Sequence, residues 1–265
     1  MSVPILFCAD DFAYADAVDA GIAELIERGR LTAASCLVAS PRWPRAAARI
    51  RGLRERADFG LHLDFTEFAK LAPLARLWSS ARLGLLRAPA LRARIDAQLA
   101  SFEDALGCRP DYVDGHQHAH QLAPIARVLI EALRERYEGD ALPWVRVSLP
   151  AARDLKSRLI AATGARALAR ALDDAGIAHN HRLFGIYDFT AQPDYAVRLE
   201  KWLRDARAGD ALMCHPARDA VAGDPLGEAR VREFRALASD DTAALLRRID
   251  VYAARGDCLR ERRAA

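Results

Sequence analysis

Short apolar runs alternate with amphipathic stretches along most of the chain. Residues 3–8 form an apolar run, and the apolar positions of 18–26 recur at helical spacing before Gly29 ends the helix. The same order then recurs, with further strands predicted at 33–39, 58–63, 112–113, 144–147, 184–186 and 211–214. Further helices are predicted at 42–56, 91–106, 124–137, 151–174, 195–206 and 240–254.

This alternation predicts a parallel sheet of about seven strands, closed or nearly closed into a (β/α) barrel. An open, doubly wound sheet is the alternative. No linker, low-complexity tract or repeat interrupts the pattern, so we expect one barrel domain over residues 1–265. Residues 71–89 are apolar but lack periodicity, which is typical of a lid or an insertion over a site.

Composition removes several classes of function. The 39 basic and 36 acidic residues are scattered, and a nucleic-acid-binding surface would need clustered basic residues. No apolar run approaches the ~20 residues of a membrane span, and Asp10 and Asp11 interrupt the first apolar run, which argues against a secretory signal. The five cysteines lack a CxxC pair, so we expect reduced thiols and a cytoplasmic protein.

The unusual polar residues follow the predicted strands. In a parallel barrel, the carboxyl ends of the strands meet at one face, so residues distant in sequence share a pocket there. The residues at these positions are Asp10, Asp11, His62, Asp114, His116, His118, His120, Arg146 and His215.

Each of these signals also has a structural explanation. An Asp-Asp pair is common at helix N-caps and turns, but one carboxylate can also bind a metal while its neighbour takes a proton from metal-bound water. A single histidine such as His62 at a strand end is often a core residue. The alternate histidines His116, His118 and His120 favour metal binding instead, although neighbours two apart share one side of an extended segment, so spacing leaves the ligand open.

Two imidazoles and a carboxylate, with positions left for water and substrate, are typical of a catalytic metal site. Nitrogen ligands favour zinc or another first-row metal over magnesium. His215 is either a general acid for a leaving amine or a strand-end residue. Arg146 would hold a substrate oxygen, orient the catalytic carboxylate, or form an internal ion pair.

The sequence resembles the YdjC-like carbohydrate deacetylases, which include chitooligosaccharide deacetylases and a hopanoid-associated relative. The resemblance covers about residues 3–216 and is carried by these motifs: Ala9-Asp10-Asp11-Phe12, Gly29-Arg30-Leu31-Thr32 with Ala34-Ser35, Phe59-Gly-Leu-His-Leu-Asp-Phe-Thr66, Asp114-Gly-His-Gln-His-Ala-His120 and Met213-Cys-His-Pro216. Family members usually have glycine after the first motif, whereas Ala13 and Tyr14 stand here, so we expect bulkier side chains in this loop at the floor of the pocket and a different substrate size.

The resemblance implies a deacetylase barrel that removes an acetyl group from an N-acetylated sugar, with one divalent ion, zinc or magnesium. It implies Asp11, His62 and His116 as metal ligands, Asp10 as the base and His215 as the acid. We assign Arg146, Asp114, His118 and His120 to substrate binding. A small carbohydrate is the expected partner, and the apolar segment 71–89, with relatives that pair, is consistent with a homodimer.

Two other functions fit parts of the pattern. Two histidines and one carboxylate also form the metal site of non-haem iron oxygenases, although a second adjacent carboxylate has no evident task there. A non-catalytic carbohydrate-binding protein could share the fold, but it would not need to retain Asp10, Asp11, His62, His116 and His215.

Overall fold

The centre of the protein is a sheet of eight parallel strands. The computed structural model describes residues 2–151 and 155–261. The strands run in the order β5-β4-β3-β2-β1-β7-β6, and β8 pairs with β1. They are β1 (Val3–Phe12), β2 (Ala33–Cys36), β3 (Asp58–Leu63), β4 (Tyr112–Gly115), β5 (Trp144–Val145), β6 (Leu183–Phe184), β7 (Ala211–Cys214) and β8 (Val251–Ala254).

The two ends of this strand order approach each other. Isolated parallel bridges join Val145 to His179 and Pro150 to Leu183, which links the β5 end of the sheet to β6. The sheet is therefore an incompletely closed barrel, and the predicted α/β barrel fold is confirmed. The central strand β1 is buried from Ile5 to Phe12, as expected of a strand covered on both sides.

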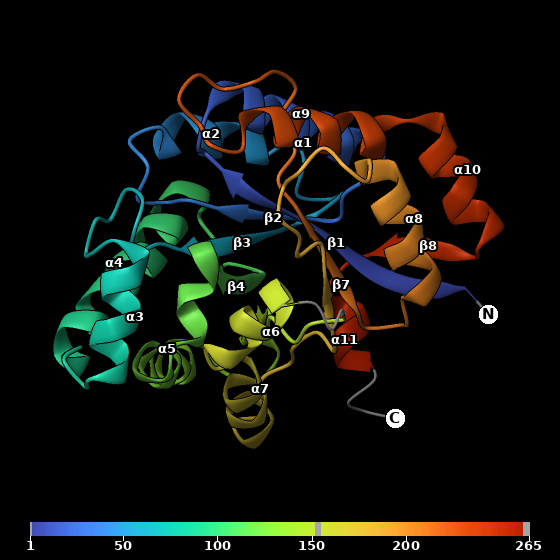
Figure 1. The fold of residues 1–265 in the computed structure, drawn as a ribbon. Coiled ribbons are helices and arrows are strands. Elements are labelled where there is room, and N and C mark those ends of the chain that lie inside the picture. The colour runs from blue at the N-terminus through green and yellow to red at the C-terminus, as the bar shows by residue number, and fades with distance from the viewer. Residues whose placement is uncertain (1, 152–154, 262–265) are drawn as a thin grey trace.

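Helices surround the sheet because each parallel connection needs a crossover (Figure 1). In α1, for example, Val18, Ile22 and Leu25 recur at helical spacing and are fully buried. The helices are α1 (Asp16–Glu27), α2 (Trp43–Ile50), α3 (Leu74–Arg82), α4 (Ala88–Leu106), α5 (Ala123–Arg136), α6 (Leu155–Ala162), α7 (Ala165–Asp174), α8 (Tyr195–Asp205), α9 (Gly227–Ala238), α10 (Asp240–Arg248) and α11 (Asp257–Glu261), with 3-10 segments η1 (His116–Gln121) and η2 (Gly139–Ala141).

Two predicted helices differ in the structure. The first is the helix expected at 151–174. Residues 152–154 of this range lie outside the described residues, and the rest forms two helices, α6 and α7, separated at Gly164. A side chain at Gly164 would lie 2.1 Å from the carbonyl oxygen of Gln121, and its φ is 132°, so glycine breaks the helix there.

The helix expected at 240–254 is α10 followed by the eighth strand, β8. In β8 the buried residues are Val251 and Ala254. They are three positions apart, which is also a helical spacing, so the pattern alone did not separate the two structures.

The segment 71–89 contains helix α3, which its sequence pattern did not predict. Leu77 of α3 is buried, whereas Leu83 and Leu85 beyond it are exposed.

None of the helices in the described ranges combines the length and apolar character needed to cross a bilayer. All five cysteines are free, and Cys8, Cys36 and Cys214 are buried.

Candidate metal and active site

Strand β1 brings two neighbouring aspartates to the same site. Between Ala9 and Phe12, β1 contains one more residue than the paired stretch of β2, and Asp11 has a φ of 69°. A bulge of this kind turns a side chain away from the strict alternation of a strand. Both Asp10 and Asp11 therefore line one cavity, although adjacent strand residues normally face opposite sides.

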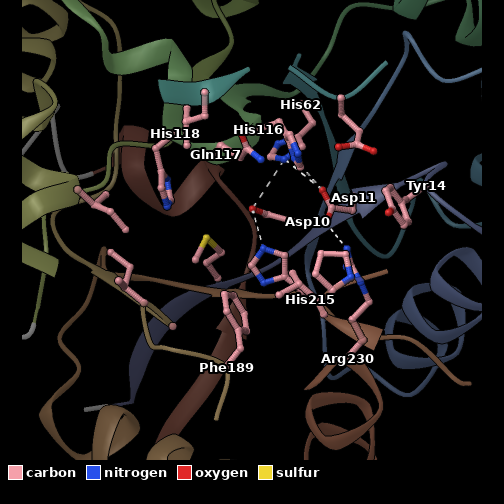
Figure 2. A pocket seen from close by; sticks show the side chains of 18 of the residues that line it. Asp10, Asp11, Tyr14, His62, His116, Gln117, His118, Phe189, His215 and Arg230 are labelled. Carbon is pink, nitrogen blue, oxygen red and sulfur yellow. Dashed lines mark hydrogen bonds and ion pairs between the residues drawn. The ribbon is translucent and has the colours of Figure 1, made fainter. Parts of the chain in front are cut away.

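The cavity has a volume of about 590 Å³ and lies at the carboxyl ends of the strands (Figure 2). Its polar floor includes Asp10, Asp11, His62, His116 and His215. Its walls are largely apolar or aromatic and include Tyr14, Leu74, Trp78, Leu159, Ile160, Ile186, Tyr187, Phe189, Met213 and Leu226.

Three side chains at the floor could share one metal ion. Oδ1 of Asp11 lies 3.1 Å from Nδ1 of His116 and 3.5 Å from Nε2 of His62. One ligand atom from each of the three lies within 4.8 Å of the others. A carboxylate oxygen and two imidazole nitrogens at this spacing suit a divalent cation.

Hydrogen bonds outside this cluster orient the two buried members. His62 donates from Nδ1 to Oδ1 of Asp114 at 2.6 Å, which leaves Nε2 facing Asp11. Arg230 donates to Oδ2 of Asp11 at 2.7 Å, which leaves Oδ1 toward the histidines. Metal-bound histidines commonly donate their other nitrogen to a carboxylate, so the donor set fits a metal ion.

Charge around the cluster is balanced by buried neighbours. Burial disfavours the charged form of Asp11, but the Arg230 guanidinium and the two histidines hold the pKa of this carboxyl well below its usual range. Burial likewise disfavours the His62 imidazolium, but Asp114 and Asp10 raise the pKa of His62 to about 10 in the metal-free protein. The buried carboxylates thus favour a positive charge on or beside His62.

Asp10 is held from behind by Arg146. Two nitrogens of the Arg146 guanidinium donate to the two Asp10 oxygens at 2.5 and 2.7 Å, and one of them also lies 2.8 Å from Asp114. Arg146 is 1% exposed. A planar guanidinium that binds both carboxylate oxygens fixes the orientation of the carboxylate. Oδ2 of Asp10 faces His62 across the cavity floor and lies 3.9 Å from its Nε2.

His215 lies on the other side of Asp10. It follows β7 directly, and its Nε2 is 3.8 Å from Oδ2 of Asp10. Burial lowers the pKa of His215 to about 4, so the imidazole is neutral at pH 7 in the metal-free protein. The ring of Phe189 packs edge-to-face against the His215 ring, with 5.4 Å between the two ring centroids.

The remaining histidines of the cluster point in different directions. Residues 116–121 form η1 rather than an extended segment, with φ of 53° at Gln117 and 59° at His118, so alternate histidines do not share one side. His118 lines the cavity and bonds to Oγ of Ser148 at 2.8 Å. His120 donates to the carbonyl of Arg146 at 2.8 Å.

Three residues assigned to substrate binding from the sequence lie behind the floor. Asp114, His120 and Arg146 are at most 1% exposed and are not among the residues that line the cavity. Their side chains bond to His62, to the main chain of Arg146 and to Asp10, respectively. Their position favours support of the site over contact with a ligand.

Helix α9 supplies site residues that the sequence analysis did not identify. Arg230 binds Asp11 and also donates to Asp224 at 2.6 Å, and Glu233 accepts a hydrogen bond from the His215 main chain. Arg230 and Glu233 are three residues apart on the buried face of α9, with Leu237 one turn further on. The sequence did not mark these two residues, because charged residues on a helix are usually exposed and only the packing of α9 shows that these are buried.

Solved structures share this fold. A crystal structure from Enterococcus faecalis V583, which carries the provisional description of a cellobiose-phosphate cleavage protein, matches with a TM-score of 0.75 at 19% identity and covers 98% of this chain and 99% of that chain. The structure of a peptidoglycan N-acetylglucosamine deacetylase matches with a TM-score of 0.54 at 12% identity over 98% of this chain and 91% of its own. At these identities the likeness concerns the fold alone.

Sequence relatives and a family match extend the comparison. A carbohydrate deacetylase of Mus musculus is 33% identical over 50% of this chain and 47% of its own length, and a chitooligosaccharide deacetylase of Proteus mirabilis (strain HI4320) is 28% identical over 48% and 54%. The chain thus spans about half the length of the curated relatives it matches. Residues 4–248 match the family described as YdjC-like protein, and the chain therefore belongs to that family.

Proposed function

We propose that this protein is a divalent-metal-dependent hydrolase that removes the acetyl group from an N-acetylated amino sugar or a related carbohydrate. The observation that carries the proposal is the meeting of Asp11, His62 and His116 beside Asp10 and His215 at the floor of one cavity. Family membership and the names of the matched deacetylases support it.

Asp11, His62 and His116 would hold the ion. Two nitrogen donors favour zinc or another first-row metal, and magnesium is the alternative that the family resemblance implies. When bound, such an ion acidifies a water molecule and polarises an acetamide carbonyl. Arg230 and Asp114 keep the ligand atoms of Asp11 and His62 turned toward it.

Asp10 is the proposed general base. Its Oδ2 faces the cavity floor, and Arg146 fixes the carboxylate so that this oxygen does not turn away. Asp10 takes a proton from the attacking water as the new carbon–oxygen bond forms. A fixed base needs little reorganisation at the moment of reaction.

His215 is the proposed general acid. It is neutral at pH 7 in the metal-free protein, so it must receive a proton during the reaction, and Asp10 lies 3.8 Å away. The proton taken by Asp10 passes to His215 and then to the departing nitrogen as the carbon–nitrogen bond breaks. His118, Tyr187 and Phe189 line the part of the cavity in which the sugar would bind.

The test is acetate release from a panel of N-acetylated sugars by protein loaded with zinc or magnesium. We expect metal-dependent release from at least one sugar. Binding of a sugar without release would favour a carbohydrate-binding protein, and oxygen uptake with iron and 2-oxoglutarate would favour an oxygenase.

The residue assignment is tested by Asp10→Asn. This variant keeps the size of the side chain and removes the base, so turnover should fall by about 10²- to 10⁴-fold while metal content is unchanged. Metal content by elemental analysis and acetate release are measured on the same preparation. Full activity in Asp10→Asn would refute the assignment of the base.

A further inference from the structure

Glu233 is a buried carboxylate directly behind His215. It lies on the inner face of α9 and is 1% exposed. Burial of a carboxylate is costly unless hydrogen bonds compensate it. Glu233 makes two such bonds, and each leads to a residue that lines the cavity.

The first bond holds the main chain of His215. The backbone N–H of His215 donates to Oε2 of Glu233 at 2.5 Å. His215 is the first residue after β7, so its N–H no longer belongs to the sheet ladder. Glu233 therefore satisfies a donor at the point where the chain leaves the barrel.

The second bond ties the same carboxylate to the cavity wall. The Tyr187 hydroxyl donates to Oε1 of Glu233 at 2.7 Å. Tyr187 belongs to the segment after β6, and its ring lies 4.7 Å from the ring of Phe189, which in turn covers His215. One carboxylate thus connects α9, the end of β7 and the wall after β6.

The ring of His215 lacks a comparable anchor. Its Nδ1 is buried and has no hydrogen-bond partner among the described residues. A histidine that transfers protons is usually oriented through its second nitrogen. Here the position of the ring depends on packing and on where the main chain is held.

We infer that Glu233 is a positioning residue for the general acid, and that it acts by fixing the His215 main chain through its hydrogen bond to the His215 N–H. The inference rests on the proposed function, because it assigns Glu233 to the step in which the amine departs. A shift of about an ångström in His215 would lengthen the proton transfer to the leaving nitrogen.

This role makes a prediction about leaving groups. An amine needs a proton to depart, whereas p-nitrophenolate leaves as a stable anion. Loss of Glu233 should therefore impair hydrolysis of an N-acetylated sugar far more than hydrolysis of p-nitrophenyl acetate. General loss of structure or of metal would impair both reactions alike.

The experiment compares Glu233→Ala with the wild type on p-nitrophenyl acetate and on the panel sugar that the wild type cleaves fastest. With metal content unchanged, we expect kcat for the sugar to fall about 10- to 100-fold with KM changed less than about threefold, and kcat for the ester to fall less than about threefold. Glu233→Gln keeps the volume and an acceptor oxygen, so it should restore sugar turnover to within about fivefold of the wild type.

A double-mutant cycle with His215→Ala tests whether Glu233 acts through His215. If it does, the double variant should lose no more sugar turnover than His215→Ala alone. Glu228→Ala is the matched control, because Glu228 is an exposed carboxylate on the same helix, and it should match the wild type. Additive losses, or an equal loss on sugar and ester in Glu233→Ala, would overturn the inference. A wild-type protein that releases no acetate from any sugar would instead refute the proposed function.

Discussion

The two neighbouring aspartates of β1 are each paired with a buried arginine, but the two arginines differ in origin and surroundings. Arg146 follows β5, lies behind the floor and binds Asp10 and Asp114. Arg230 comes from α9, lines the cavity and binds Asp11 and Asp224. One arginine thus orients the proposed base and the other orients a proposed metal ligand.

The difference indicates that the proposed base and one proposed metal ligand are supported by separate parts of the molecule. The strand ends support Asp10, and a helix late in the chain supports Asp11. The Nη1 atom of Arg230 is buried without a hydrogen-bond partner among the described residues, whereas Arg146 is not among the residues with such atoms. The α9 support is the less completely satisfied of the two.

The largest effect should come from loss of the proposed metal ion. His116→Ala removes a proposed ligand, so we expect loss of bound metal and at least about a 10³-fold loss of acetate release. Metal is measured by elemental analysis after gel filtration. His181→Ala, a change at an exposed histidine outside the cavity, is the control. Retention of metal by His116→Ala would mean that the ligand set is different.

The comparison itself is tested by replacing each arginine with methionine. Arg230→Met should weaken metal binding about 10- to 100-fold and regain turnover when more metal is added. Arg146→Met should lose turnover about 100-fold and should not respond to added metal, because it affects the base. Metal titration followed by acetate release distinguishes them. Rescue of Arg146→Met but not of Arg230→Met by metal would reverse the assignment.

A smaller effect concerns the stability of the α9 side. Burial raises the pKa of Glu233 to about 7, against the hydrogen bonds from His215 and Tyr187, which lower it. An acid with a raised native pKa contributes stability that is complete below its unfolded pKa of about 4.3 and is lost as pH rises through about 7. The charged or titratable residues that interact with the Glu233 carboxyl through hydrogen bonds or electrostatics are Asp10, Tyr187, Tyr195, Cys214, His215 and Arg230.

A glutamine side chain does not titrate, so the Glu233→Gln variant should not lose this stability as the pH rises. Between pH 5 and pH 8 the wild type should lose stability relative to Glu233→Gln, by on the order of 3 kcal/mol. Thermal unfolding of both proteins at the two pH values measures the difference. An equal change with pH in both proteins would show that Glu233 does not titrate in this window.

The barrel and much of the floor could be predicted from the sequence because both follow from periodicity. Residues that follow buried parallel strands meet at one face, and this rule brought together Asp10, Asp11, His62 and His215. The choice of His116 came only from the family resemblance. Spacing could not supply it, because η1 depends on two left-handed residues that a sequence pattern does not show.

The α9 side could not be predicted in the same way. Arg230 and Glu233 occupy α9, a charge-rich helix that the sequence pattern did not predict. Their burial depends on how α9 packs against α1 and α8, which is a tertiary property. The eighth strand was missed for a similar reason, since four residues carry too little pattern to separate strand from helix.

The extra residue in β1 has a consequence for how this scaffold can change. Because Asp10 and Asp11 are consecutive, the separation of the proposed base from the proposed metal ligand is set by main-chain geometry and not by the packing of separate segments. Movement of the surrounding helices would carry both groups together. The apolar walls can therefore vary in shape while the spacing of the two carboxylates stays the same.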